Sequence, residues 1–213
     1  GASGDMSTTA WHARNRSQWI KVTGLLAVAV LLLLPFVALA FFAVPEGDDF
    51  TYAVNGRRHF FAFQARHYLT WGGRYTPTFL ISGLPQVIGI TSWYGFYPLA
   101  LLGGLVGAST MVFGRLLERR QTMLPACALG ATAVGLYVAT MPELREGLYW
   151  MSGAVTYQSG IIFWLCLLGL IWSGSKRLPA LILAAVVALA GSGCSAVTSG
   201  AGGVVLGVLV LYR

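Results

Sequence analysis

The residues best suited to chemistry are concentrated in the stretch 45–75, which is polar and aromatic within an otherwise apolar chain. This stretch holds three of the seven carboxylates, four of the fourteen lysine and arginine residues, and two of the three histidines. Asp48 and Asp49 follow a long apolar run, and a charged side chain at a bilayer centre costs about 2.5–3.5 kcal/mol. We therefore expect the pair at a membrane interface or in a wet cavity, where carboxylates could transfer a proton or bind a metal ion. The alternative is a solvated turn, because Gly-Asp-Asp is also ordinary turn sequence.

The composition predicts an integral membrane protein. Of the 213 residues, 56% are hydrophobic and only 10% are charged, and the mean hydropathy is +0.70. Such a chain has too few ionisable side chains to cover a water-soluble domain of this size. The net charge of +7 comes from short basic clusters between apolar runs, which set membrane topology and argue against nucleic-acid binding. The three cysteines, Cys127, Cys166 and Cys194, show no CxxC spacing, so neither a zinc site nor a disulfide framework is indicated.

Apolar runs of about 20 residues predict an all-α, polytopic transmembrane bundle with about six spans. The predicted spans are 22–44, 94–114, 123–141, 155–173, 178–189 and 197–211. The apolar segment 76–91 is short and interrupted by Gly83 and Pro85, so we expect it to be re-entrant or interfacial instead of crossing. Polar and aromatic residues at helical spacing in 59–70 predict a short interfacial helix in the first outer loop.

The basic residues predict that the N-terminus lies in the cytoplasm, by the positive-inside rule. Residues 1–21 then form a cytoplasmic tail, of which 1–5 could be a scar of tag removal, and 22–213 form a single transmembrane domain with outer loops 45–75 and 142–158. The basic residues placed inside are Arg14, Arg16, Lys21, Arg115, Arg119, Arg120, Lys176, Arg177 and Arg213.

Aromatic residues cluster near the predicted outer boundary. They are Trp71, Tyr75, Trp93, Tyr94, Tyr97, Tyr149, Trp150 and Tyr157. A belt of tryptophan and tyrosine is expected at any membrane interface. Here, however, acids, arginines and aromatic rings from two loops share one membrane face. That combination suits an anionic lipid phosphate carrying a sugar, because arginine pairs with phosphate oxygens and aromatic faces stack on sugar rings.

Three motifs follow one another along the chain: EGDDFTYA at 46–53, YLTWGGRY at 68–75 and LREGLYWMSGAVTYQ at 144–158. Through them the chain resembles a poorly characterised bacterial multispanning family of the GT-C glycosyltransferase superfamily, related to O-antigen glucosyltransferases. The resemblance implies a multi-pass enzyme of the inner (cytoplasmic) membrane that moves a sugar from a polyprenyl-phosphate donor to a glycan or lipid acceptor on the extracytoplasmic side. Such enzymes are usually longer, so we expect this chain to be an N-terminal portion. Cys194 stands where related sequences often carry an acidic residue.

The resemblance also implies roles for individual residues. Asp48 or Asp49 would be the catalytic base, or would hold a divalent cation such as Mg or Mn. Arg74 would bind the donor phosphate. The other residues implied in substrate binding are Trp71, His67, Arg66, Tyr149, Trp150 and Tyr157.

Two other functional classes stay open. One is a lipid or solute transporter, which is disfavoured because none of the six predicted spans carries an ionisable residue. The other is a non-catalytic assembly subunit, which would form a homo- or hetero-oligomer through a glycine-rich helix face and would not need the Asp-Asp pair.

Overall fold

The computed structural model describes residues 3–91, 94–117, 123–175 and 177–211. Throughout these residues the chain is helical apart from short connections, which confirms the predicted fold class. The helices are α1 (Ser3–Ala40), α2 (Asp48–His67), α3 (Tyr75–Ile88), α4 (Phe96–Leu116), α5 (Met123–Ala139), α6 (Met151–Trp172), α7 (Leu178–Ser192) and α8 (Ala196–Leu211). Two single π-helical turns, η1 (Tyr68–Gly72) and η2 (Arg145–Tyr149), precede α3 and α6.

Every predicted span corresponds to a helix. The helices long and apolar enough to cross a membrane are Ser17–Ala40 within α1, Phe96–Leu116 and Met151–Trp172, and the shorter apolar ones are Met123–Ala139, Leu178–Ser192 and Ala196–Val208. The interfacial helix predicted over 59–70 is part of the longer α2, which begins at Asp48. Two of the helices that correspond to predicted spans also begin several residues earlier than predicted. α1 is helical well before residue 22, and α6 starts at Met151 instead of 155. The second difference arises from tertiary contacts that cap α6, described below.

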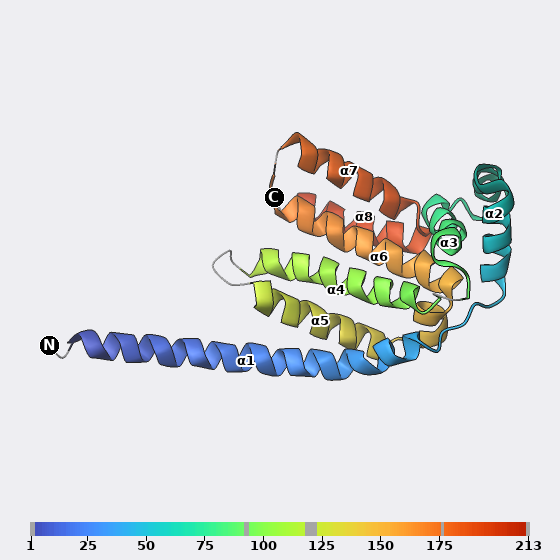
Figure 1. The fold of residues 1–213 in the computed structure, drawn as a ribbon. Helices are drawn as coiled ribbons and strands as arrows, with labels where there is room; N and C mark the ends of the chain where they lie inside the picture. Colours follow the sequence, from blue (N-terminus) through green and yellow to red (C-terminus); the bar gives the residue numbers. More distant parts are fainter. Residues whose placement is uncertain (1–2, 92–93, 118–122, 176, 212–213) are drawn as a thin grey trace.

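The long helices lie side by side and alternate in direction (Figure 1). α1 runs from the end that carries the N-terminus to the opposite end, where α2, α3 and η2 gather and where α4 begins. We call this opposite end the loop end. Because the chain leaves α1 and enters α4 at the same end, the segment 76–91 does not cross the bundle, in agreement with the sequence-based expectation. Arg115, near the end of α4, and Arg177, before α7, lie toward the other end.

The buried core is concentrated between the central helices and the loop end. One cluster joins Ile81 of α3 to Tyr94, Tyr97 and Met151, and a second joins α4, α5 and η2 through side chains that include Leu148. The four segments α3, α4, α6 and η2 are thus fixed to one another where the polar loops meet. The first of these clusters contacts both motifs of the predicted site, because it contains Met151 from 144–158 and Tyr52 from 46–53 packs against it.

Some of the glycines allow close helix packing, as expected in membranes. A methyl group at Gly104 would lie 2.8 Å from Ile162, and one at Gly202 would overlap the ring of Trp164. In contrast, a methyl group at Gly203 or Gly207 would have open space around it. Packing therefore accounts for only part of the glycine content.

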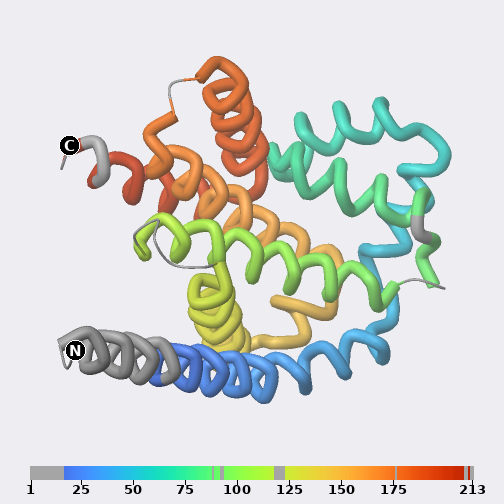
Figure 2. The backbone as a smooth tube through the Cα atoms, turned by 60° about the vertical axis from the view of Figure 1, so that its left-hand side comes forward, coloured from blue at the N-terminus to red at the C-terminus, as the bar shows by residue number. Residues whose placement is uncertain are grey.

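α2 is sharply bent at His59, whose backbone is not helical (φ −147°, ψ 56°). Tyr52 and His67 would lie about 22 Å apart along a straight helix. Instead their ring centroids are 5.2 Å apart, and the rings of Tyr52 and Phe63 are 5.6 Å apart. The second half of α2 therefore folds back beside the first, and α3 packs against it at the loop end (Figure 2).

Candidate functional site

Asp49 caps the N-terminus of α6 from a distant part of the chain. Its Oδ1 accepts hydrogen bonds from the backbone N–H of Ser152 (3.0 Å) and from the Ser152 hydroxyl (2.7 Å). Its Oδ2 accepts from the Tyr94 hydroxyl and from the backbone N–H of Glu46 (3.2 Å). The residue that precedes α6, Trp150, makes no capping bond with its own side chain. Asp49 supplies the acceptor that the first amides of the helix need, and its charge is favourable beside the positive end of the helix dipole.

Tyr94 completes the cap. The Tyr94 oxygen accepts a hydrogen bond from the backbone N–H of Met151 (3.1 Å) while its hydroxyl donates to Asp49. Burial raises the pKa of Tyr94, and the hydrogen bond to Asp49 adds to this effect, so the phenol keeps its proton at neutral pH. Asp49 is fully buried, and both of its oxygens are engaged by four protein donors. It therefore has the environment of a structural carboxylate.

Asp48 has the opposite environment. Its side chain is exposed and lines a pocket of about 210 Å³ at the loop end. The other residues lining this pocket are Glu46, Gly47, Arg145, Glu146 and Trp150. Of the two aspartates that the sequence proposed for catalysis, Asp48 is the one whose carboxylate can meet a substrate. We call this the acidic pocket.

An apolar groove of about 350 Å³ shares Glu46, Arg145 and Trp150 with the acidic pocket. The rest of its lining comes from the end of α1 and from η2: Leu39, Phe42, Ala43, Val44, Leu144 and Tyr149. The Tyr149 hydroxyl donates to the backbone oxygen of Phe36 (2.9 Å), which holds η2 against α1, and burial raises the pKa of Tyr149 to about 12. The acidic pocket and the groove together form a cleft with a polar head and an apolar tail.

Arg145 is the donor in this cleft that is available to a ligand. Arg145 pairs with Glu46, but the two side chains are 71% and 50% exposed. An exposed ion pair contributes only about 0–1 kcal/mol, so a ligand anion can replace Glu46 at little cost. The Trp150 indole N–H is buried and has no hydrogen-bond partner among the described residues. Because this nitrogen has almost no accessible surface, it is not exposed to a ligand in the cleft.

The bend of α2 brings together residues that the sequence separates. The Tyr52 hydroxyl lies 2.9 Å from Nε2 of His67, and the Thr78 hydroxyl lies 3.3 Å from Nδ1 of His67. Burial raises the pKa of Tyr52, the charge of Asp48 raises it further, and the charge of Arg74 lowers it. The pKa of Tyr52 therefore responds to the charges of both the predicted catalytic residue and the predicted phosphate-binding residue.

The hydrogen bonds define the tautomer of His67. The Thr78 hydroxyl donates to the backbone oxygen of Arg74 (2.5 Å), so toward His67 it can only accept. His67 consequently carries its proton on Nδ1, and Nε2 accepts from Tyr52. Both ring nitrogens are occupied, which makes His67 a link between α2 and α3 and leaves neither nitrogen free for a substrate.

Acid is expected to weaken this link. Burial and the neighbouring Arg74 lower the pKa of His67 below its ordinary value. As the pH falls below about 6.5, the unfolded chain takes up a proton more readily than folded His67, so the free energy of unfolding decreases. We therefore expect lower amide protection factors in α2 and α3 at pH 5.5 than at pH 7.5. A protection factor already corrects the exchange rate for its intrinsic dependence on pH. His67→Gln should remove this effect and His59→Gln, at an exposed position, should keep it; equal pH dependence in all three proteins would contradict the assignment.

The remaining predicted site residues lie apart from the cleft. Trp71 is 83% exposed at the end of η1, Arg66 is exposed on the second half of α2, and Tyr157 is partly exposed on α6. Arg74 is exposed beside the Tyr52 and His67 pair. Trp93 lies outside the described residues, as do Arg119, Arg120, Lys176 and Arg213.

Sequence reasoning missed several residues of the site. Those are Tyr52, Glu46, Arg145 and Glu146 around Asp48, and Ser152 in the cap of α6. Arg145, Glu146 and Ser152 belong to the motif at 144–158, and Glu46 and Tyr52 to the motif at 46–53. The sequence therefore showed that these residues belong to the motifs. Only the tertiary structure shows that the two motifs contact each other.

The divalent-cation site predicted at Asp48 and Asp49 stays a prediction. Among the described residues, no group of three or more His, Cys, Asp or Glu side chains is arranged to hold a metal ion. Asp49 is committed to four protein donors, so the Asp-Asp pair offers only Asp48 as a ligand. Glu46 and Glu146 line the same pocket as Asp48.

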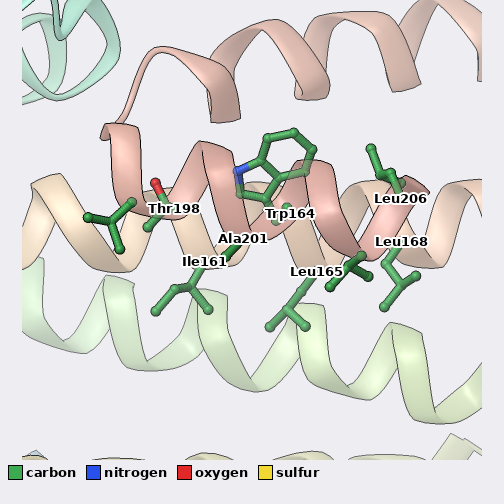
Figure 3. A pocket seen from close by; sticks show the side chains of 10 residues that line it. Ile161, Trp164, Leu165, Leu168, Thr198, Ala201 and Leu206 are labelled. Atoms are coloured by element: carbon green, nitrogen blue, oxygen red, sulfur yellow. The ribbon is translucent and has the colours of Figure 1, made fainter. Parts of the chain in front are cut away.

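A second pocket, of about 380 Å³, lies between α6 and α8 (Figure 3). Its lining is almost wholly apolar, with Ile161, Leu165 and Leu168 from α6 and Ala201 and Leu206 from α8, beside the ring of Trp164. No titratable side chain lines it. Its chemistry suits hydrocarbon, so we place any reaction at the loop end.

We compared the chain with protein-family models, with curated proteins and with solved structures. None of the three comparisons found a match. The resemblance to GT-C glycosyltransferases therefore stays a prediction that rests on the three motifs.

Proposed function

We propose that this chain is a membrane glycosyltransferase, or the donor-binding portion of one, that uses a polyprenyl-phosphate-linked sugar at its loop end. The observation that carries the proposal is the cleft at this end. Its acidic pocket, lined by the exposed carboxylate of Asp48, adjoins an apolar groove along the end of α1. A lipid-linked sugar has a polar head and a hydrocarbon chain, and this cleft offers a complementary surface to each. The loop end is extracytoplasmic in this proposal, as the basic residues at the other end favour.

The chemistry assigned to the cleft is a single displacement. An acceptor hydroxyl attacks the anomeric carbon of the sugar, the bond from that carbon to the phosphate oxygen breaks, and the phosphate leaves with the bonding electrons. Asp48 takes the proton of the attacking hydroxyl as general base. Arg145 leaves its ion pair with Glu46 and binds the phosphate of the donor. Its positive charge stabilises the negative charge that the phosphate gains as it leaves.

Arg145 takes the phosphate-binding role that the resemblance gave to Arg74. The reason is position, because Arg145 lines the acidic pocket whereas Arg74 neighbours Tyr52 and His67 outside it. Arg74 is retained as a second phosphate contact to be tested. In the described helices that are long enough to span, the charged residues Lys21 and Arg115 lie near helix ends, so none sits at the mid-membrane depth that coupled transport would use.

Binding of the donor tests this proposal directly. In nanodiscs, a labelled polyprenyl-phosphate glucose should bind saturably to the wild-type protein. A hydrogen bond to a charged group contributes about 1.5–3 kcal/mol, so Arg145→Gln should weaken binding about tenfold or more. Arg115→Gln, at the other end of the bundle, should leave the affinity unchanged.

Two further arms separate the alternatives. If Arg74→Ala weakens binding and Arg145→Gln does not, the phosphate lies beside Tyr52, and the role of Arg145 is wrong. The uncharged polyprenyl alcohol should bind more weakly than the phosphate and should show no dependence on Arg145. Absence of saturable donor binding to folded wild-type protein would contradict the proposed function and favour an assembly subunit.

A further inference from the structure

The segment that contains the bend of α2 carries uncompensated positive charge. Residues 50–75 include four arginines, Arg57, Arg58, Arg66 and Arg74, and no aspartate or glutamate. All four side chains are exposed. Among the described residues the one ion pair joins Arg145 to Glu46, so none of these four arginines has an acidic partner. Their charge is available to a ligand outside the chain.

The same segment exposes large apolar side chains. Phe61 is 82% exposed, Leu69 79% and Trp71 83%. Phe61 contacts Phe60 with its ring (centroids 5.3 Å apart), and Phe60 contacts Phe79 of α3 (5.2 Å), which is itself 54% exposed. The aromatic surface is therefore continuous from α2 to α3, and contact with water would be unfavourable over this area.

The position of the segment determines which partner fits. α2 and α3 lie at the ends of the spanning helices, beyond the apolar bundle (Figures 1 and 2). In a bilayer this is the level of the lipid headgroups, where aromatic rings sit at the boundary and arginines pair with phosphate oxygens. Arg57, Arg58 and Phe61 lie within five residues around the bend, so charge and apolar contact are presented together.

We propose that the bend of α2 docks onto the anionic phospholipid headgroups of the surrounding membrane. The surface consists of Arg57, Arg58, Phe61, Arg66 and Trp71. The guanidinium groups bind headgroup phosphates, and the rings of Phe61 and Trp71 enter the boundary with the acyl chains. This contact holds the α2 and α3 pair at a fixed depth in the bilayer. It uses neither Asp48 nor Arg145 and so does not depend on the transfer reaction.

Competitive photo-crosslinking tests the proposal. The protein is placed in nanodiscs with equal amounts of phosphatidylglycerol and phosphatidylcholine, each carrying the same photoreactive group at the top of one acyl chain. Peptic peptides from 57–71 are then analysed for adducts of each lipid. We expect several-fold more phosphatidylglycerol than phosphatidylcholine on these peptides. At 1 M salt the screening length falls to about 3 Å, so the preference should shrink.

Variants locate the preference. Arg57→Gln/Arg58→Gln should bring the ratio of the two adducts most of the way to one, because each arginine near a charged surface contributes separately. Phe61→Ser should instead reduce labelling by both lipids. Adducts near Arg115 and Arg177 provide an internal control, and Arg115→Gln should leave the ratio at 57–71 unchanged.

Three outcomes would overturn the proposal. Equal labelling by both lipids in the wild-type protein would show that charge does not select the headgroup. An unchanged ratio in the double arginine variant would place the selectivity elsewhere. Absence of adducts from either lipid on 57–71 would show that water or another protein covers this surface.

Discussion

Replacing Asp48 by Asn should lower the rate of sugar transfer by about 10²–10⁴-fold, the usual contribution of a general base. The amide has the shape of the carboxylate but cannot take the proton of the acceptor hydroxyl. Because the Asp48 side chain is exposed, the variant should fold as stably as the wild-type protein. The measurement is release of polyprenyl phosphate from a labelled donor in nanodiscs, with the acceptor present, together with the thermal midpoint of each protein.

The neighbouring residue provides a matched control for this experiment. Asp49→Asn is the same chemical change one position further along the chain, and it should lower stability. Transfer measured well below its unfolding temperature should decline much less in Asp49→Asn than in Asp48→Asn. Full activity in Asp48→Asn, with normal donor binding, would remove Asp48 as the base while leaving the binding proposal intact.

Replacing Asp49 by Ala should destabilise the protein strongly. The change leaves the Ser152 backbone N–H and hydroxyl and the Tyr94 hydroxyl without their acceptor in a buried site. Each buried donor left unsatisfied costs about 1–3 kcal/mol, so a loss of more than about 2 kcal/mol is expected. For a chain of this size that corresponds to a fall of about 4–8 °C in the thermal midpoint. The N-terminal turn of α6 should also exchange its amide hydrogens faster, because Ser152 loses its acceptor and Tyr94, which accepts from Met151, loses the partner that orients it.

A double-mutant cycle makes this prediction specific to the cap. Tyr94→Phe and Ser152→Ala should each destabilise the wild-type protein but have much smaller effects when Asp49 is already Ala, because their shared partner is gone. Additive losses would mean that the three residues act independently. A normal thermal midpoint for Asp49→Ala would contradict the structural role and return Asp49 to the candidates for catalysis.

The sequence by itself determined the membrane character, the number and order of the apolar helices, and the segment 76–91 that does not cross. Long apolar runs form helices in a bilayer, because no water is present there to hydrogen-bond the backbone N–H and C=O groups. The length of an uncharged run can be read from the sequence without tertiary information. The motifs at 46–53 and 144–158 were likewise visible as the polar stretches of an apolar chain. Burial could not be read from them, since Asp48 and Asp49 are the same residue type in adjacent positions.

Tertiary structure decided which residues act together. The cap of α6 joins Asp49, Tyr94 and Ser152 across as many as 103 residues, and it divides the aspartate pair into one buried and one accessible carboxylate. The bend at His59 brings His67 to Tyr52, whereas the sequence predicted a helix only over 59–70 and gave no sign of the bend. Both results depend on hydrogen bonds and packing between segments far apart in sequence, and local propensity carries no information about such pairings. The geometry of the candidate site is for that reason a property of the fold.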